Sequence, residues 1–480
     1  MTDHQDLIAA KQLSATEFSP ITSTTDTSDI IVCSRVRPVL PFDGDDFNVF
    51  SAHHPQLTVH EPTKTLSQEP TISDQSFTFD YSFGHYDDNN TVYSCVGQSQ
   101  LEFAMSGNIA VVLAYGQTGS GKTYTVASLQ TNCISSIFAH PKISELEVSV
   151  SVFEIQGTNA YDLISPSTVV HINEDVFGHV NPRDATVVLA TSEAQLQQVV
   201  ADAFSHRKTV GTLRNDTSSR SHAVTRISFK NLVVPSAEPG VLYLIDLAGS
   251  ERASDQREHT PELRKQAKEI NKSLMGLKEC IRKRTLSFVD AKHHHIPYRQ
   301  SKITLLLKDV FELRSLRQCR TCFFVCVSPL SQDVSHSINS LRYAAPMRVV
   351  SQGAKRNVYV DPKDPASYEP EKLARWVSKF SNELVDPVVF EGMSGMQVLR
   401  LTEADFISRC LTDRFSEKQA KLLYTKLWGK AIDCRTKRRS DLLDPKKHRA
   451  DRENFDEELI ARSKAEERTE SARELLQKLY

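Results

Sequence analysis

Long apolar runs are missing from this chain of 480 residues, and none approaches the roughly 18 residues that a membrane-spanning helix needs. The opening "MTDHQDLIAAKQLSATEFSPITSTTDTSD" also lacks the charged start and apolar core of an export signal. We therefore expect neither membrane insertion nor export, and we expect a cytoplasmic protein.

Net charge is also small. The chain has 58 Lys and Arg against 60 Asp and Glu, which gives a formal charge of -2. A balance this even provides no overall attraction to nucleic acid or anionic lipid, so local patches must supply any attraction to an acidic partner. We expect no nucleic-acid partner.

The nine cysteines are scattered and suggest no metal framework. Several lie in apolar stretches such as "TCFFVCVSP", residues 321–329, which predicts buried, reduced thiols in a cytosolic protein. Hydrophobic residues make up 39% of the chain and charged residues 25%, as in soluble globular proteins. The length is sufficient for one large domain and one or more smaller ones.

The residue pattern along the chain predicts five segments. Residues 1–28 are polar and rich in Ser and Thr, which predicts a flexible lead. Over residues 29–352, short β-rich runs alternate with helical stretches, which is typical of a mostly parallel sheet with helices on both faces. Residues 353–367 have the Pro and Asp density of a linker. Residues 368–432 predict a small all-α domain, and residues 433–480 predict a basic and then charged helical tail.

The stretch "GQTGSGKT", residues 116–123, fits the pattern G-x-x-x-x-G-K-[ST]. The apolar run at 109–115 predicts a buried strand in front of this loop. Glycines let backbone N–H groups converge on phosphate oxygens, Lys122 can reach the outer phosphates, and Thr123 can offer its hydroxyl to magnesium. The alternative is a Gly-rich turn without a ligand, which the preceding strand disfavours. The sequence therefore predicts a bound nucleoside triphosphate.

A second stretch, "DLAGSE" at 246–251, follows another apolar strand. Asp246 stands where a carboxylate can hold a magnesium-bound water. Gly249 has no side chain that would keep its N–H away from the γ-phosphate. A strand-end carboxylate is the plain alternative for Asp246 taken alone.

The third stretch is "NDTSSRSH", residues 215–222. Ser218 and Ser219 offer hydroxyl groups to a metal and to an attacking water. Arg220 and Glu251 have opposite charges, so an ion pair between them can close the site when the γ-phosphate draws both loops inward. Each residue alone is equally consistent with a polar surface loop, but the order of the three stretches favours a γ-phosphate sensor.

These stretches, together with "INKSL" at 270–274 and "YRQSKITLLLKD" at 298–309, resemble the kinesin motor domain in kinesin order. The resemblance covers residues 29 to about 350 and implies a P-loop NTPase fold that hydrolyses ATP with Mg²⁺. It implies that "RVRP", residues 35–38, lines the adenine pocket and that Tyr124 covers the other face of the base. The implied nucleotide-binding residues are Arg35, Arg37, Pro38, Gly116, Gln117, Thr118, Gly119, Ser120, Gly121, Lys122, Thr123 and Tyr124. The implied magnesium set is Thr123, Ser219 and Asp246, and the implied catalytic set is Ser219, Arg220, Gly249 and Glu251.

Within the family the chain is similar to the kinesin-13 class, which removes tubulin from microtubule ends. The similarity lies in residues 59–83, in "VFEIQGTNAYDLI" at 152–164 and in "LKECIR" at 277–282. The Lys-Val-Asp tip of that class is absent, and "TKTLSQEPTIS" at 63–73 takes its place. A lattice-walking or sliding kinesin and an inactive microtubule scaffold stay open as alternatives.

The family resemblance implies tubulin as the partner. Microtubules are acidic, so the tubulin-facing segment should be positively charged. The candidates are Lys265, Lys268, Lys272, Lys278, Arg282, Lys283, Arg284, Lys292, Arg299, Lys302 and Lys308, although a solvated helix face explains any one of them. We expect Lys278 and Arg282 to share a tubulin-gripping face, with Glu279 pointing aside.

The helical segment 368–432 resembles a sterile-alpha-motif (SAM) domain in its phrase "VLRLTEADF", residues 398–406. A generic helical bundle is the alternative. The resemblance implies a protein partner or self-association through this domain.

Overall fold

The computed structural model describes residues 2–14, 30–65, 67–166, 168–175, 180–213, 220–235, 237–251, 261–289, 294–312, 318–348, 362–399 and 401–443. These residues form two compact units. The first contains the described residues up to Phe229 and from Gly240 to residue 348, and the second contains Lys230–Pro239 and those from residue 362 onward. None of the described helices is both long and apolar enough to cross a membrane.

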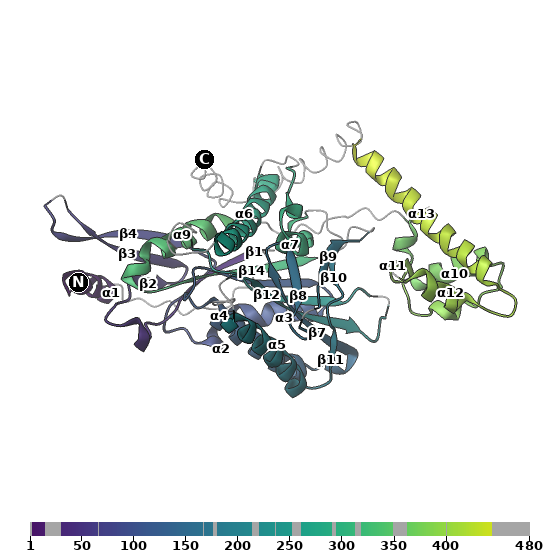
Figure 1. The fold of residues 1–480 in the computed structure, drawn as a ribbon, viewed down its shortest axis with the longest axis horizontal. Helices are drawn as coiled ribbons and strands as arrows, with labels where there is room; N and C mark the ends of the chain where they lie inside the picture. The colour runs from purple at the N-terminus through teal and green to yellow at the C-terminus, as the bar shows by residue number, and fades with distance from the viewer. Residues whose placement is uncertain are drawn as a thin grey trace. The chain divides into compact units, whose positions relative to one another are not determined.

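The first unit is built on a mixed sheet (Figure 1). From one edge to the other its strands are β11 (Val188–Ala190), β7 (Leu146–Gln156), β12 (His222–Asn231), β13 (Gly240–Asp246), β6 (Ile109–Tyr115), β14 (Cys319–Val327), β1 (Ile30–Val36) and β5 (Tyr81–Phe83), and β8 (Asn159–Asp162) pairs with β7. Strands β13, β6, β14, β1 and β5 run parallel, whereas β8, β11 and β12 are antiparallel to a neighbour. The predicted mostly parallel centre is confirmed.

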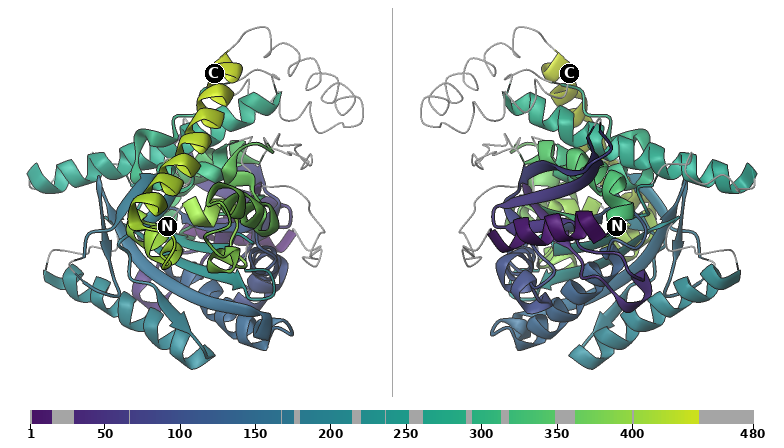
Figure 2. Two further views of the ribbon diagram at one scale, coloured as in Figure 1. Left: turned by 90° about the vertical axis from the view of Figure 1, so that its right-hand side faces the viewer. Right: turned by 90° about the vertical axis from the view of Figure 1, so that its left-hand side faces the viewer.

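Helices cover both faces of this sheet because its central strands are apolar on both sides. In β6, Val111 and Leu113 face one hydrophobic core, whereas Ala110 and Val112 face the other. The first core contains side chains from α6 (Pro261–Val289), α7 (Lys302–Leu306), α8 (Lys308–Phe311) and α9 (Val334–Ala344). The second contains side chains from α3 (Gln98–Met105), α4 (Lys122–Ala139) and α5 (Glu193–Leu213). Figure 2 shows the two helical layers on opposite sides of the strands.

The cysteines support packing rather than a metal site. Cys319 and Cys322 are spaced C-x-x-C, but both lie on β14, where residues three apart point to opposite faces. Cys322 belongs to the core under α4, and Cys319 packs against the core under α6. Burial raises the pKa of Cys133 to about 12, which keeps that thiol protonated.

Two small antiparallel sheets extend from the first unit. One joins β2 (Phe50–His53), β3 (Gln56–Lys64) and β4 (Pro70–Thr78), and the other joins β9 (His171–Glu174) and β10 (Val180–Arg183). Helix α1 (Thr2–Ser14) packs on the first of these sheets. Ile8 is 1% exposed, His4 donates to the carbonyl of Thr63 at 2.8 Å, and Lys11 pairs with Asp74. Residues 2–14 are thus a packed helix where the polar composition predicted a flexible lead, and residues 15–29 lie outside the description.

The described residues of the second unit from 362 onward form helices and no strand, as predicted. They contain η9 (Pro365–Ser367), α10 (Pro370–Phe380), η10 (Pro387–Phe390), α11 (Gly395–Leu399), α12 (Glu403–Cys410) and α13 (Glu417–Leu443). Its buried residues include Leu373, Trp376, Phe390, Phe406 and Leu427. Two expected boundaries differ, since Pro365 of the expected linker is buried and α13 continues past residue 432 to Leu443. The predicted tail beyond residue 443 lies outside the described residues.

Candidate nucleotide-binding site

Sheet topology brings the first two predicted stretches together. Strand β13 runs parallel to β6, with Asp246 opposite Ala114, so both strands end at the same edge of the sheet. The loop 116–121 leaves β6 there and leads directly into α4. Beyond β13, Leu247 N–H donates to the Ala114 carbonyl at 3.1 Å, and Ser250 N–H donates to the Gly116 carbonyl at 3.1 Å. "DLAGSE" therefore runs alongside the predicted phosphate loop.

Two glycines are required by close approach. A Cβ atom on Gly116 would lie 2.2 Å from the Cys326 carbonyl oxygen of β14, so only glycine fits at that point. A Cβ atom on Gly249 would lie 2.4 Å from a carboxylate oxygen of Glu251. The absence of a side chain at Gly249 therefore leaves room for Glu251 to lie against the loop.

Asp246 forms the buried centre of the site, with 2% of its surface exposed. Its Oδ2 atom accepts from the Thr123 hydroxyl at 2.8 Å and from Arg207 Nη1 at 3.1 Å. Its Oδ1 atom is buried and has no hydrogen-bond partner among the described residues. A carboxylate oxygen without a partner beside a Thr hydroxyl suits the oxygen shell of Mg²⁺, so these residues fit the predicted metal. Ser219, the third predicted ligand, lies outside the described residues.

Lys122 is held inside the loop, where 7% of its surface is exposed. Its Nζ atom donates to the Gln117 carbonyl at 2.7 Å. Burial lowers the pKa of Lys122, and the nearby carboxylates of Asp246 and Glu251 oppose this shift. A phosphate oxygen is a stronger acceptor than a backbone carbonyl for this ammonium group. Lys122 is therefore placed to transfer its hydrogen bond to a bound phosphate.

Glu251 contacts the phosphate loop directly. Its Oε2 atom accepts from the Thr118 N–H at 3.0 Å, and its Oε1 atom accepts from the Thr118 hydroxyl. The carboxylate thus links the end of "DLAGSE" to the loop at 116–121. The predicted ion pair with Arg220, which is partly exposed, stays a prediction.

The predicted base-binding residues surround the start of α4. Arg35 is 8% exposed and donates to the Thr125 hydroxyl at 3.1 Å and to Asn89 Oδ1 at 2.6 Å. Its guanidinium carbon lies 5.5 Å from the centre of the Tyr124 ring. The Tyr124 side chain is exposed, so a ring face is available for stacking on a base.

Arg37 contacts the phosphate loop directly. Its Nε atom donates to the Gly119 carbonyl at 2.7 Å, and its guanidinium pairs with Asp43 at 2.7 Å. It also donates to the carbonyl of Pro38 at 2.8 Å. Arg37 therefore contacts the phosphate loop, and the implied place of Arg37 and Pro38 in an adenine pocket stays a prediction.

Sequence reasoning missed Arg207, Asn89 and Asp43. Arg207 is 4% exposed and donates to the Ser221 carbonyl at 2.9 Å as well as to Asp246. It lies on α5, shortly before "NDTSSRSH", and that proximity was the one available signal. Asn89 begins α2 (Asn89–Val92), far in sequence from any motif, so no signal pointed to it.

His222 connects the site to α6. The Ala248 N–H can only donate, so His222 Nδ1 accepts from it at 3.0 Å and Nε2 carries the ring proton. Nε2 then donates to the Ser273 hydroxyl at 2.8 Å, and Ser273 donates to the Ile270 carbonyl at 2.7 Å. Burial lowers the pKa of His222 to about 3, so the ring is neutral.

The predicted tubulin-facing cations differ widely in their surroundings. Lys268 and Lys272 are exposed on α6, whereas Lys278 is half-buried with its Nζ atom 5.2 Å from the centre of the Tyr343 ring. Arg282 pairs with Glu279 at 2.8 Å. Glu279 therefore does not point aside as expected, because its carboxylate reaches the guanidinium one helical turn away.

Acidic Glu174 of β9 pairs with two more of these cations. Arg299 Nη2 lies 2.6 Å from one Glu174 oxygen, and Lys308 Nζ lies 2.8 Å from the other. Lys308 is 5% exposed, and Lys302 Nζ donates to the Ile172 carbonyl at 3.0 Å.

The remaining predicted cations also differ in exposure. Lys265 is exposed, Lys283 Nζ lies 4.0 Å from a Glu279 oxygen, and Arg284 is buried. Lys292 lies outside the described residues. The sequence therefore overstated the free positive charge of this face.

Replacing His222 with Gln should change how stability depends on pH. In the wild type the pKa of His222 is about 3 in the folded state and about 6.5 in the unfolded state. The free energy of unfolding therefore decreases as the pH falls from about 6.5 toward 3. The glutamine side chain does not titrate, so the difference in free energy of unfolding between wild type and H222Q should narrow by ~2 kcal/mol from pH 7 to pH 5. Urea unfolding measures this difference, with His295→Gln as an exposed control. A constant difference across that range would contradict the buried neutral ring.

The comparisons with known proteins agree with this geometry. The kinesin motor domain model matches residues 35–350. Mouse kinesin-like protein KIF24 is 34% identical over 344 residues, covering 69% of this chain and 25% of that protein. Kinesin-like protein KIN-13B of Arabidopsis thaliana is 33% identical over 335 residues, covering 68% of this chain and 48% of that protein.

Solved structures agree as well. The KIF14 dimer, solved with AMP-PNP in complex with a microtubule, matches with a TM-score of 0.56 and 27% identity, covering 67% of this chain and 94% of that chain. This chain spans between a quarter and a half of the length of the two curated relatives. On the family match and the fold, the chain belongs to the kinesin motor-domain family.

Proposed function

We propose that this protein is an ATP-hydrolysing, microtubule-binding kinesin of the cytoskeleton that destabilises microtubule ends, as the kinesin-13 class does. The observation that carries the ATPase assignment is the buried Asp246 carboxylate. It is held by Thr123 and Arg207, with one oxygen left without a partner among the described residues, and the Glu251-bound loop lies at the same sheet edge.

In this proposal the loop 116–121 presents its N–H groups to the phosphates of ATP, and Lys122 transfers its hydrogen bond from Gln117 to a phosphate oxygen. Bound magnesium supplies neutralisation of phosphate charge, and Thr123, Ser219 and Asp246 would hold it. Tyr124 stacks on the base beside Arg35, as the exposure of its ring allows.

The residues around the γ-phosphate then act on water and protons. Ser219 would orient the attacking water, and Glu251 would receive the proton through the waters that it organises. Glu251 already touches the phosphate loop at Thr118, so a bound γ-phosphate would have to share this position with it. Arg220 would close the site by pairing with Glu251 once ATP is bound.

Microtubule binding is supported by family membership and by the similarity to KIF14, which was solved on a microtubule. The exposed Lys268 and Lys272 provide positive charge on α6 for an acidic filament. His222 and Ser273 connect this helix to Ala248 beside the nucleotide loop. This connection gives a route by which tubulin contacts at α6 can alter the nucleotide site.

End disassembly is supported by the similarity to KIN-13B and by "LKECIR" on α6. A lattice-walking or sliding motor is the second candidate, because residues 63–73 replace the Lys-Val-Asp tip on the β3–β4 hairpin. We further propose that the helical unit is SAM-like and serves a protein partner or self-association.

Glu251→Ala should slow ATP hydrolysis by ~100-fold or more while nucleotide binding persists, because the proton path is lost but the phosphate loop is kept. Single-turnover hydrolysis and binding of a fluorescent ATP analogue measure the two effects separately. Glu145→Ala removes an exposed carboxylate elsewhere in the first unit and should leave both unchanged. Wild-type hydrolysis by the Glu251 variant would refute this role.

Purified protein with ATP should shorten stabilised microtubules observed by fluorescence microscopy. Lys278→Ala combined with Arg282→Ala should slow shortening and weaken binding in a salt-dependent way, each contact contributing ~1 kcal/mol or less. Lys142→Ala removes an exposed lysine elsewhere and serves as the control. Steady gliding or stepping without shortening at any protein concentration would replace the kinesin-13 assignment with the walking alternative.

A further inference from the structure

We propose that the helical second unit carries a cationic face that binds the acidic surface of the microtubule, independently of the motor. The inference rests on the proposed function, because it takes the microtubule as the partner of the motor unit. The face consists of Lys372, Arg375, Lys379, Lys426 and Lys430, and we call it the α10–α13 face.

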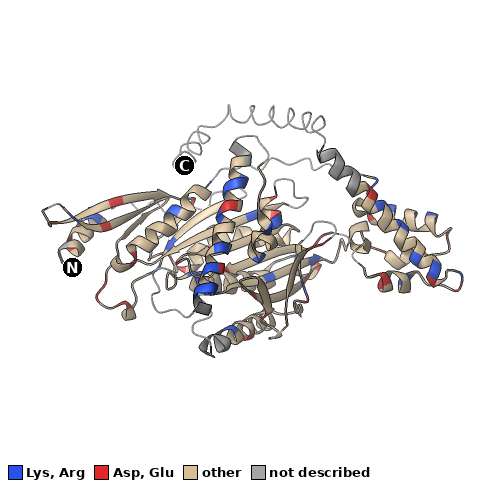
Figure 3. Ribbon diagram, turned by 45° about the horizontal axis from the view of Figure 1, so that its top comes forward, with Lys and Arg blue, Asp and Glu red and all other residues tan. Residues whose placement is uncertain are grey.

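The face is formed by two helices. On α10, Lys372, Arg375 and Lys379 are spaced by three and four residues, so they lie along one side of the helix. Lys426 and Lys430 are spaced by four residues on α13. Figure 3 shows Lys and Arg recurring along α13.

The rings of Tyr368 and Phe380 each contact one lysine from α10 and one from α13. Lys372 Nζ lies 4.4 Å and Lys430 Nζ lies 5.4 Å from the centre of the Tyr368 ring. Lys426 Nζ lies 4.2 Å and Lys379 Nζ lies 5.8 Å from the centre of the Phe380 ring. Such contacts favour a cation over the ring face, so these flexible side chains lose less entropy when a partner binds.

The cations of the α10–α13 face have no acidic partner in the part of the chain that the structure describes. No described carboxylate forms an ion pair with any of the five; Lys430 instead donates to the Tyr368 hydroxyl at 2.7 Å, and Arg375 donates to the Glu371 carbonyl at 3.3 Å. Lys421 of the same unit, by contrast, pairs with Glu403 at 2.8 Å. The face therefore keeps its positive charge for an external acidic surface.

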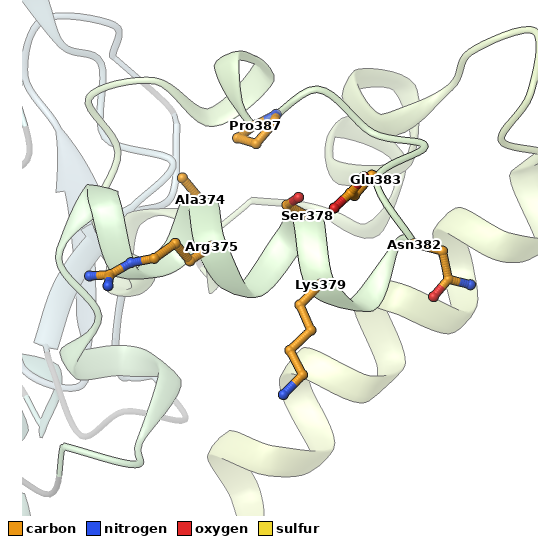
Figure 4. Close-up of a pocket in the computed structure, with 7 residues that line it drawn as sticks. All are labelled: Ala374, Arg375, Ser378, Lys379, Asn382, Glu383 and Pro387. Carbon is orange, nitrogen blue, oxygen red and sulfur yellow. The ribbon is translucent and has the colours of Figure 1, made fainter.

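A hollow of about 700 Å³ lies beside α10. Figure 4 shows Ala374 and Ser378 pointing toward Pro387, whereas Arg375 and Lys379 extend away from Pro387. The hollow gives room for a side chain of the partner next to these two cations. Glu383 also lines the hollow and would repel an acidic group. An acidic side chain of the partner would therefore bind near Arg375 and Lys379.

The chemistry of the face favours an acidic protein over RNA or membrane. Tyr368 is 3% exposed and carries ammonium groups on its ring, so it is not available to stack on bases. Helix α10, described over its whole length, has no exposed large apolar side chain, and α13 has two among its described side chains, Leu422 and Ile432. Two such residues among the lysines of α13 are fewer than the continuous apolar side of a helix that lies in a bilayer surface. A microtubule already held by the motor would meet this face at high effective concentration.

The test uses the full-length chain with Arg375→Glu and Lys379→Glu together. Arg414→Glu with Lys418→Glu is the control, because it makes the same charge change at exposed positions outside the face. In microtubule cosedimentation over a range of salt, the face variant should bind about 3- to 10-fold more weakly than the control, with a shallower salt dependence. Poly-L-glutamate should compete with the control protein more strongly than with the face variant. Maximal ATPase activity should be equal in both.

Equal microtubule affinity of the two variants would overturn the inference. The inference would also fail if Arg375 and Lys379 were needed for binding an RNA oligonucleotide or phosphatidylserine vesicles but not microtubules. Wild-type protein that neither pellets with microtubules nor responds to them in ATPase assays would instead contradict the proposed function. Lys426→Gln, which removes a cation above Phe380, provides a second variant whose binding should also weaken if the double variant folds poorly.

Discussion

The structure of the candidate site depends on one buried charge, the carboxylate of Asp246. A carboxylate at this depth is costly unless it is paired and hydrogen-bonded. Arg207 and Thr123 provide those partners, one from α5 and the other from α4. Because Asp246 ends β13 beside β6, the same carboxylate fixes how closely α4, α5 and the phosphate loop approach one another.

The same edge of the sheet connects to the face proposed for tubulin. His222 begins β12, receives the Ala248 N–H and donates to Ser273 on α6. Its neutral ring allows both contacts at once, which a protonated ring would not. Positive charge on α6 and the neighbouring helices is meanwhile limited, since Glu279 and Glu174 each pair with two of the expected cations. Exposed Lys268 and Lys272, and the α10–α13 face of the other unit, offer the positive charge that an acidic filament can reach.

Features encoded in contiguous residues could be predicted from the sequence. The loop 116–121, the strand before it and the two-sided covering of the sheet follow from local pattern, because glycine spacing and strand periodicity are read within a few residues. The all-α character of the second unit could be predicted in the same way. Roles for Asp246 and Glu251 followed from the order of the three stretches, but their partners Arg207 and Thr118 were not assigned.

Features created by distant contacts could not be predicted. Arg207 and Asn89 acquire their roles only when α5 and α2 pack at the sheet edge, and nothing near Asn89 in sequence marks this. Helix α1 was missed because distant contacts attach it: His4 and Gln12 donate to backbone carbonyls, Lys11 pairs with Asp74, and Ile8 is buried. The charge of the tubulin-facing segment was overstated because Glu174 lies more than a hundred residues before its partner Arg299.

The central claim is that ATP turnover at Asp246 and Glu251 is coupled to a filament through α6. The most direct measurement is steady-state phosphate release by the full-length chain as microtubules or free tubulin are added. The account predicts that phosphate release accelerates and saturates with microtubule or tubulin concentration, because "NDTSSRSH" and "DLAGSE" require an external partner to align them. Release that stays unchanged at saturating microtubules and at saturating free tubulin would contradict it.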